Sequence, residues 1–322
     1  MAYVSVIIPC FNAAPWVREA LESVGSQGVP DVEIIVVDDG STDSTARIVE
    51  EEFPSVRLIK TENQGPSRTR NLGTRMSSGK FVQYLDADDL LAPGKLRVQC
   101  EALERSGADV AYGDWEGWVK QPDGRFLASR VVKRQIEGDP EIALFTDFWC
   151  PPAAYLFRRG IVEQVGGWNE TLPIIQDARF ALDCAFHNAV FRYCSGVMAY
   201  YRRHSKESVS QRDPVGFVRD CLRNAEQVEA IWRSRGGITE PRKRALIEVY
   251  QHAARNSYGK DAAAFEQAYA SLERLSPGYC PRAPALLSLL SRFAGYRRAE
   301  GMAYRYRRVK NLIFPRSTES FR

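Results

Sequence analysis

The sequence lacks the features of a membrane-spanning, disulfide-linked or nucleic-acid-binding protein. No window approaches the ~20 apolar residues of a membrane span. The first residues run directly into an apolar stretch that ends at Pro9, without the pattern of a secretory leader. The 7 cysteines are odd in number and show no C-x-x-C spacing, which argues against a disulfide framework or a zinc site. We therefore expect a reducing, cytoplasmic compartment. A net charge of +4 is too small to indicate nucleic-acid binding.

Carboxylates gather instead where an apolar run, 81–85, comes to an end. Asp86, Asp88 and Asp89 follow this run, at the expected carboxyl end of a buried strand. Like charges at this spacing repel and raise one another's pKa unless a cation lies among them. Mg²⁺ or Mn²⁺ held by one or two carboxylates keeps coordination positions for phosphate oxygens. The cluster predicts a metal site, and capping of the next helix by Asp88 and Asp89 is the alternative.

Two further apolar runs, 4–8 and 32–37, also end in polar residues. Continuous apolar runs bounded by turn residues are typical of parallel strands buried on both faces. Ligands of open α/β sheets bind outside the carboxyl ends of such strands. We therefore expect one acidic pocket, lined by Asn12, by Asp38 with Asp39, and by Asp86 with Asp88.

Five stretches together resemble the glycosyltransferases of family 2, which have the GT-A fold. In the order and spacing of that family, they are 4–12, 36–43, 63–73, 85–89 and 166–170. The resemblance covers about the first two thirds of the chain. It implies an α/β fold in which a Rossmann-like, mostly parallel sheet is flanked by helices.

The expected catalytic domain is 1–205, with a nucleotide-binding half of about 1–114 and an acceptor-side half of about 115–205. Helices are expected from Pro15, from Thr42 or Asp43, and after Ser67, and strands near 56–60, 80–85 and 109–114. Periodicity fades from Trp115 to about Cys150, which predicts either an acceptor-side loop or a small aromatic cluster. Helical spacing then predicts a helical C-terminal region, 206–322.

The resemblance also implies roles for individual residues in binding a nucleotide sugar, most often a UDP-sugar. Asp39 should accept a hydrogen bond from the base, Pro9 and Phe11 should back the nucleotide, and Arg70 should contact phosphate or base. An ordinary solvated helix arginine is the alternative for Arg70. The expected donor-binding residues are Pro9, Phe11, Asn12, Asp39, Gly65, Arg70 and Asp86. The expected metal ligands are Asp88, Asp86 and His204, where His204 is otherwise a hydrogen-bonded residue at the domain border.

Asp177 matches the catalytic base of the family, which removes the proton from the acceptor hydroxyl. Many relatives have two acidic residues here, and Gln176 is a departure that should lower the pKa of Asp177 somewhat. The alternative for Asp177 is a helix N-cap.

The segment from Arg292 to Arg316 has eight Lys or Arg, one acid, Glu300, and several aromatic residues. This composition suits either an anionic membrane surface or a solvated helix face.

Taken together, the sequence predicts an inverting, metal-dependent transferase that uses a saccharide or lipid-linked saccharide acceptor in surface polysaccharide or glycolipid synthesis. One alternative is a sugar nucleotidyltransferase, which would need a glycine-rich loop after the first strand that Pro9 to Asn12 does not provide. A catalytically inactive binding module is the other.

Overall fold

The computed structural model describes residues 2–203 and 212–313. The chain divides into two compact units, Met1–Arg212 and Asp213–Arg322. The domain border expected at residues 205 and 206 lies outside the described residues. Within the described ranges, no helix combines the length and the apolar character needed to cross a membrane.

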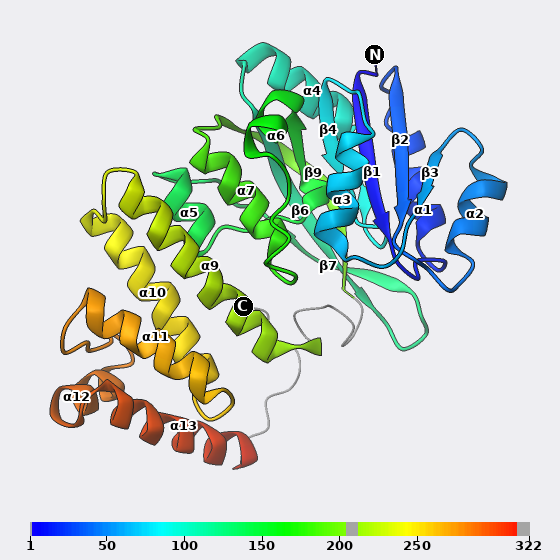
Figure 1. The fold of residues 1–322 in the computed structure, drawn as a ribbon. Helices are drawn as coiled ribbons and strands as arrows, with labels where there is room; N and C mark the ends of the chain where they lie inside the picture. Colours follow the sequence, from blue (N-terminus) through cyan, green and yellow to red (C-terminus); the bar gives the residue numbers. More distant parts are fainter. Residues whose placement is uncertain (1, 204–211, 314–322) are drawn as a thin grey trace. The chain divides into compact units, whose positions relative to one another are not determined.

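Unit 1 is a nine-stranded sheet flanked by helices (Figure 1). Its elements in chain order are β1 (Val4–Cys10), α1 (Val17–Gly25), β2 (Val32–Asp38), α2 (Thr45–Glu52), β3 (Arg57–Lys60), α3 (Pro66–Arg75), β4 (Phe81–Tyr84), β5 (Leu90–Leu91), α4 (Lys95–Ser106), β6 (Val110–Lys120), β7 (Phe126–Val132), α5 (Pro140–Thr146), the 3₁₀ turn η1 (Pro152–Ala154), β8 (Tyr155–Arg158), α6 (Arg159–Val165), α7 (Gln176–Phe186) and β9 (Phe191–Arg203).

The strand order is β3-β2-β1-β4-β8-β6-β9-β5, with β7 paired to β6. β3, β2, β1 and β4 are all parallel, which agrees with the continuous apolar runs of the sequence. β8 is antiparallel to both β4 and β6, so the sheet becomes mixed beyond β4. β1 forms the middle of the parallel part, and Val4, Val6, Ile7 and Ile8 are fully buried there.

The expected helices form with small shifts in their first residues. Val17, Ala20, Leu21 and Val24 of α1 are buried at helical spacing, and the helix ends at Gly25. The helix expected from Thr42 or Asp43 begins at Thr45, because Asp43 accepts hydrogen bonds from Ala14 N and Thr45 N and holds the chain in a turn.

The segment 115–150 is more regular than the sequence predicts. Its first part forms the antiparallel pair of β6 with β7, and its last part contains α5. Most residues of β7 are exposed on both faces of the strand. A strand of this kind does not need alternating apolar and polar residues, which is the pattern that would have predicted it.

Unit 2 is helical, as expected. Its elements are α9 (Pro214–Ser234), α10 (Glu240–Ser257), α11 (Ala262–Leu275), α12 (Ala285–Ala294) and α13 (Tyr296–Ile313). Glu229 of α9 joins three helices, because its carboxylate accepts hydrogen bonds from Tyr250 of α10, at 2.9 Å, and from Arg274 of α11, at 2.9 Å. Arg233 donates to the same carboxylate at 2.6 Å. Despite burial, these hydrogen bonds and the charge of Arg274 lower the pKa of Glu229 to about 2.

Candidate active site

The carboxyl ends of β1, β2 and β4 meet at one edge of the sheet, because these strands are parallel neighbours (Figure 1). Asn12, two residues after β1, accepts a hydrogen bond from Thr42 N at 2.9 Å, and its own N–H donates to Ser41 Oγ at 2.9 Å. Asp38, the last residue of β2, accepts from Ser41 N at 3.1 Å. The loops after the two strands are therefore held together by polar contacts.

Asp39 is buried and shapes the loop that leads into α3. Its Oδ1 accepts from Gln64 N and its Oδ2 from Gly65 N, each at 2.9 Å. Gly65 has a φ of +89°, a conformation that favours glycine. Each carboxylate oxygen has two lone pairs, so Asp39 can still accept a hydrogen bond from a ligand.

Pro9 and Phe11 lie at the same strand end. Pro9 is part of β1 and is partly exposed, and Phe11 follows the strand with 53% of its surface exposed. The Phe11 ring is therefore accessible to a ligand.

Arg70 is buried, so the solvated alternative for this residue is wrong. Only 3% of Arg70 is exposed, because its guanidinium lies 4.3 Å from the centre of the Trp168 ring and forms an ion pair with Asp86. Its Nε and Nη1 have no hydrogen-bond partner among the described residues. Two of the predicted donor-binding residues, Arg70 and Asp86, are thus in direct contact.

Asn71, the next residue of α3, holds the loop that precedes α7. Its Oδ1 accepts from Trp168 N at 2.7 Å, and its Nδ2 donates to Trp168 O at 3.1 Å and to Glu170 at 3.0 Å. Gly167 has a φ of +119°, and a Cβ at this position would lie 2.7 Å from Asn71 Oδ1. A glycine is therefore required for this close approach.

The three carboxylates after β4 have different environments. Asp86 and Asp88 are partly exposed, whereas Asp89 is buried and accepts from Arg202 N, in β9, at 2.9 Å. Burial, together with the charges of Asp88 and Asp86, raises the pKa of Asp89 well above its usual value. The helix-capping alternative is wrong, because the next helix, α4, begins only at Lys95 and has Gly94 as its N-cap.

Asp86 and Asp88 also lie near the end of β1. The Cys10 thiol has a raised pKa, first because of its burial and then because of the charges of Asp38, Asp88, Asp43 and Asp86. All seven cysteines are free thiols.

The residues present fit a divalent metal ion that is shared with a ligand. Asp86 and Asp88 supply two carboxylates. Among the described residues no group of three His, Cys, Asp or Glu side chains could hold a metal, so further ligands would come from outside these side chains. Mg²⁺ and Mn²⁺ typically bind one or two carboxylates together with phosphate oxygens and water. The predicted ligand His204 lies outside the described residues.

Asp177 lies in the first turn of α7 and is held at both oxygens. Trp149 Nε1 donates to Oδ2 at 2.8 Å, and Ala178 N donates to Oδ1 at 2.8 Å. The N-cap of α7 is Ile175, without a side-chain hydrogen bond, so Asp177 is not the capping residue. Burial raises the pKa of Asp177 despite the two hydrogen bonds. α7 packs on the end of β4, because the ring centres of Phe180 and Tyr84 lie 5.5 Å apart. The charge of Asp86 raises the pKa of Asp177, and the charge of Arg70 lowers it.

Three aromatic residues from distant parts of the chain surround this base. Trp149 packs edge-to-face on Trp115, at 5.4 Å between ring centres, and on Tyr201, at 5.3 Å. Burial raises the pKa of the Tyr201 hydroxyl, and the charges of Asp89, Asp177, Asp88 and Asp86 add to this shift. Tyr201 is thus close to Asp177 and to the three carboxylates that follow β4, and no sequence pattern predicted a role for it.

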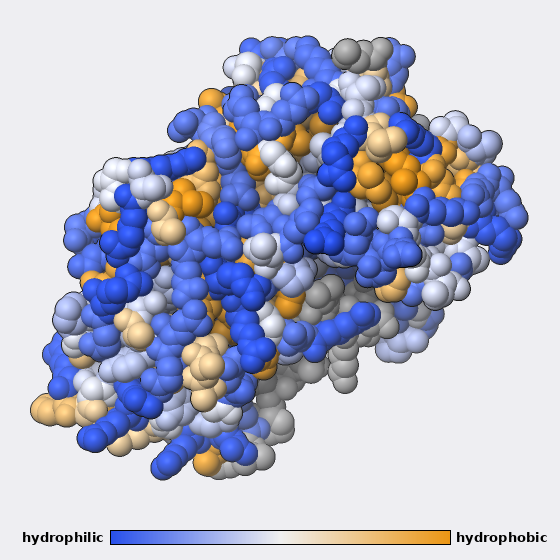
Figure 2. All heavy atoms as spheres, viewed as in Figure 1, coloured by the Kyte–Doolittle hydropathy of each residue, from blue (hydrophilic) through white to orange (hydrophobic). Residues whose placement is uncertain are grey.

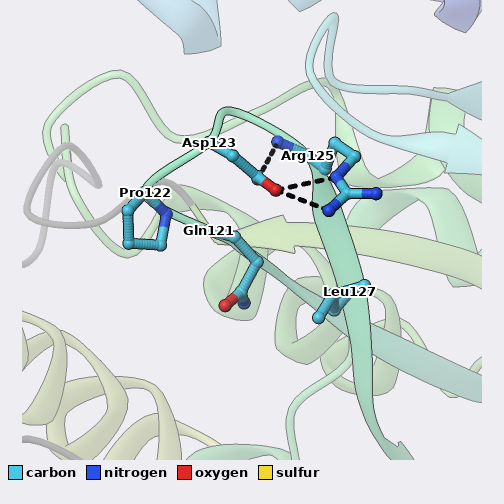
Figure 3. Close-up of a pocket in the computed structure, with 5 residues that line it drawn as sticks. All are labelled: Gln121, Pro122, Asp123, Arg125 and Leu127. Carbon is cyan, nitrogen blue, oxygen red and sulfur yellow. Dashed lines mark hydrogen bonds and ion pairs between the residues drawn. The ribbon is translucent and has the colours of Figure 1, made fainter.

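A separate pocket of about 290 Å³ lies at the turn between β6 and β7 (Figure 3). Asp123 and Arg125 form an ion pair at 2.7 Å beside it. It is lined by Gln121, Pro122, Asp123, Arg125 and Leu127, none of which is a predicted site residue.

A family model described as glycosyl transferase family 2 matches residues 5–166. The uncharacterized glycosyltransferase EpsJ of Bacillus subtilis is 28% identical over 200 residues, which cover 59% of this chain and 56% of EpsJ. The succinoglycan biosynthesis protein ExoO of Rhizobium meliloti is 36% identical over 126 residues, 38% of this chain and 36% of ExoO. The match spans less than two thirds of the length of these relatives.

Two solved structures resemble the whole fold. Residues 1–349 of S. aureus TarS, in complex with UDP-GlcNAc, match with a TM-score of 0.68 and 19% identity, over 95% of this chain and 92% of that chain. The mannosyltransferase PcManGT from Pyrobaculum calidifontis, in complex with GDP-Man and Mn²⁺, matches with a TM-score of 0.50 and 24% identity, over 97% of this chain and 88% of that chain. The likeness to TarS confirms the GT-A fold expected from the sequence.

Proposed function

Since the chain belongs to glycosyltransferase family 2, we propose that it moves a sugar, with inversion, from a UDP-sugar to a hydroxyl of a saccharide or lipid-linked saccharide. The observation that carries this proposal is the electrostatic proximity of the Asp177 carboxylate to the ion pair of buried Arg70 with partly exposed Asp86. A candidate base for the acceptor and candidate contacts for the diphosphate then belong to one site.

The nucleotide of the donor is proposed to bind at the ends of β1 and β2. Asp39 has lone pairs left for the N–H groups of a base, and Phe11 and Pro9 offer apolar surface against its ring. Asn12 and Gly65 shape the two loops that border this space. The complexes of TarS with UDP and UDP-GlcNAc, and of PcManGT with GDP-Man, support a nucleotide-sugar donor.

Arg70 is proposed to contact the diphosphate. Its Nε and Nη1 are buried and have no partner among the described residues, and such donors are costly to leave unsatisfied. Phosphate oxygens that reach them would satisfy both.

Asp88 and Asp86 are proposed to hold Mn²⁺ or Mg²⁺, with His204 as a further ligand. When bound by these carboxylates, such an ion would supply positive charge to stabilise the departing diphosphate. The Mn²⁺ of PcManGT supports a metal of this kind.

Asp177 is proposed to act as the general base. It takes the proton of the acceptor hydroxyl while the hydroxyl oxygen attacks the anomeric carbon from the face opposite the diphosphate. The bond from the anomeric carbon to the diphosphate oxygen breaks with its electron pair as the new bond forms, so one displacement inverts the configuration. The raised pKa of Asp177 makes it a stronger proton acceptor than an ordinary aspartate.

The acceptor is proposed to belong to surface polysaccharide or glycolipid synthesis at the cytoplasmic face of a membrane. The similarity to ExoO, which is named for succinoglycan biosynthesis, supports a polysaccharide setting.

The donor is tested by measuring the melting temperature of the full chain with UDP, GDP, ADP and CMP, each with Mn²⁺ or with EDTA. A ligand that binds the folded state stabilises it by mass action. We expect UDP to raise the melting temperature only when Mn²⁺ is present. Equal melting temperatures with every nucleotide, with and without Mn²⁺, would contradict the proposed donor and metal. NMR of the transfer product then reports its anomeric configuration.

A further inference from the structure

α12 and α13 carry half of the large apolar side chains that are exposed among the described residues. They are Leu286, Leu289, Phe293, Met302, Tyr306 and Val309. Phe293 is 85% exposed, more than any other large apolar residue of the described chain. Single exposed apolar residues are common, but a gathering of them marks an interaction surface.

These residues form one stripe on each helix. On α12 they follow the spacing i, i+3, i+7, from Leu286 to Phe293, and on α13 the spacing i, i+4, i+7, from Met302 to Val309. Other stripes face inward, because Leu287 and Ser291 of α12 and Tyr296, Ala299 and Glu300 of α13 are buried. The two helices pack against each other, and Gly295 makes the turn between them.

Positive charge accompanies these stripes. Between residues 285 and 313 the chain has seven Lys or Arg and one acid, Glu300, which is fully buried and paired with Arg307. Apolar and hydrophilic residues alternate over α12 and α13 (Figure 2). The exposed basic residues are Arg292, Arg297, Arg298, Arg305, Arg308 and Lys310.

We propose that the outward stripes of α12 and α13 bind an anionic lipid bilayer, with Leu286, Leu289 and Phe293 entering its interface and the basic residues contacting headgroups. Amphipathic helices with Phe and Leu beside Lys and Arg lie in the plane of such an interface. The apolar contribution begins at Leu286, before the basic tail that the sequence predicts from Arg292. Tyr296, an aromatic residue of this tail, is only 1% exposed and faces inward. Residues 314–316 lie outside the described residues.

Charge favours lipid over a second copy of the chain. Two such surfaces placed face to face would bring like charges together, whereas anionic headgroups compensate them. Each basic residue close to an anionic bilayer strengthens binding about fivefold. This inference rests on the proposed function in one respect, since a lipid-linked acceptor would explain why the enzyme binds a bilayer. Vesicle binding is measured without donor or acceptor, so the two proposals fail separately.

The test is sedimentation of the full chain with phosphatidylcholine vesicles, with and without phosphatidylglycerol. We expect binding only to the anionic vesicles, and weaker binding at high salt because of screening. Leu289→Ser with Phe293→Ser should weaken this binding at least about tenfold, since two apolar side chains lose their burial. The matched control is Leu127→Ser with Val190→Ser, which removes side chains of 56% and 59% exposure from unit 1 and should leave binding unchanged.

A charge-reversal pair tests the basic contribution. Arg305→Glu with Arg308→Glu should weaken binding by more than about tenfold, whereas Arg97→Glu with Arg105→Glu, on the exposed face of α4, should not. Circular dichroism melting checks that each variant folds. Equal sedimentation of wild type and the Leu289/Phe293 variant would overturn the proposal. So would a wild-type dimer in analytical ultracentrifugation that this variant abolishes, because a second copy would then be the occupant.

Discussion

Trp149 Nε1 donates a hydrogen bond of 2.8 Å to Oδ2 of Asp177. The other oxygen, Oδ1, accepts from Ala178 N, so the carboxylate is held in one orientation. Trp149 itself is fixed by edge-to-face packing against Trp115 and Tyr201. The proposed base is therefore positioned by an aromatic residue from a different part of the chain.

Trp149→Phe should keep the ring packing and remove the hydrogen bond. Hydrogen bonds to charged groups contribute ~1.5–3 kcal/mol, so we expect kcat to fall by about tenfold or more while KM for the donor changes little. Because this bond lowers the pKa of Asp177, its loss raises that pKa, and a base works only when ionised. The acid limb of the pH–rate profile should therefore move to higher pH. An unchanged profile would show that Trp149 does not act on the base.

Asp177→Asn should lower the rate of sugar transfer by ~10²- to 10⁴-fold, the usual contribution of a general base. Donor affinity, measured by calorimetry, should stay close to that of the wild type. Asp183→Asn is the control, since Asp183 lies on the same helix and accepts from Arg179 at 2.7 Å. That change should lower the melting temperature and leave transfer intact. Transfer by Asp177→Asn at the wild-type rate would place the base elsewhere.

Asp88→Asn should abolish Mn²⁺-dependent binding of UDP, because Asn removes a charged metal ligand. Asp89→Asn should retain Mn²⁺-dependent binding of UDP. The Asp89 carboxyl is buried and accepts a hydrogen bond from Arg202 N, and Asn can accept the same hydrogen bond. Calorimetry with and without Mn²⁺ measures both variants. Equal losses in the two would mean that the whole acidic cluster, rather than Asp88, holds the metal.

Acid should weaken unit 2 through Glu229. The folded-state pKa of Glu229 is lowered to about 2, so its stabilisation is complete above the unfolded-state value of 4.5 and is lost as pH falls toward 2. Because Arg233 and Arg274 are about half exposed, solvent screening limits this contribution to about 1–3 kcal/mol at neutral pH. Urea unfolding of Glu229→Gln should therefore show a large loss of stability at pH 7 and a smaller one near pH 3. A loss of equal size at both pH values would contradict this prediction.

Local patterns were enough to predict the parallel strands and their polar ends. The run 32–37 is buried on both faces from Ile35 to Val37, and the acidic residues after it follow directly in the sequence. Helical spacing likewise predicted the buried side of α1. These features depend on neighbours within a few residues.

Contacts between distant segments could not be predicted in this way. Arg70 is buried because Trp168 covers it, and Trp149 meets Asp177 across 28 positions of sequence. Tyr201 reaches the site because β9 pairs with β6 through shifts in register. The inward orientation of Asp89 likewise depends on Arg202, far along the chain.

α3 presents two consecutive residues to the two halves of the site. Arg70 contacts Asp86, where the donor is proposed to bind, and Asn71 holds the loop that leads to α7 and Asp177. Because the two residues are adjacent on one helix, a donor that shifts Arg70 would shift Asn71 as well and so adjust the acceptor side. We expect an ordered kinetic mechanism in which the donor binds first. UDP should then inhibit transfer competitively with respect to the donor but not with respect to the acceptor. The order of substrate binding would then be determined by one turn of one helix.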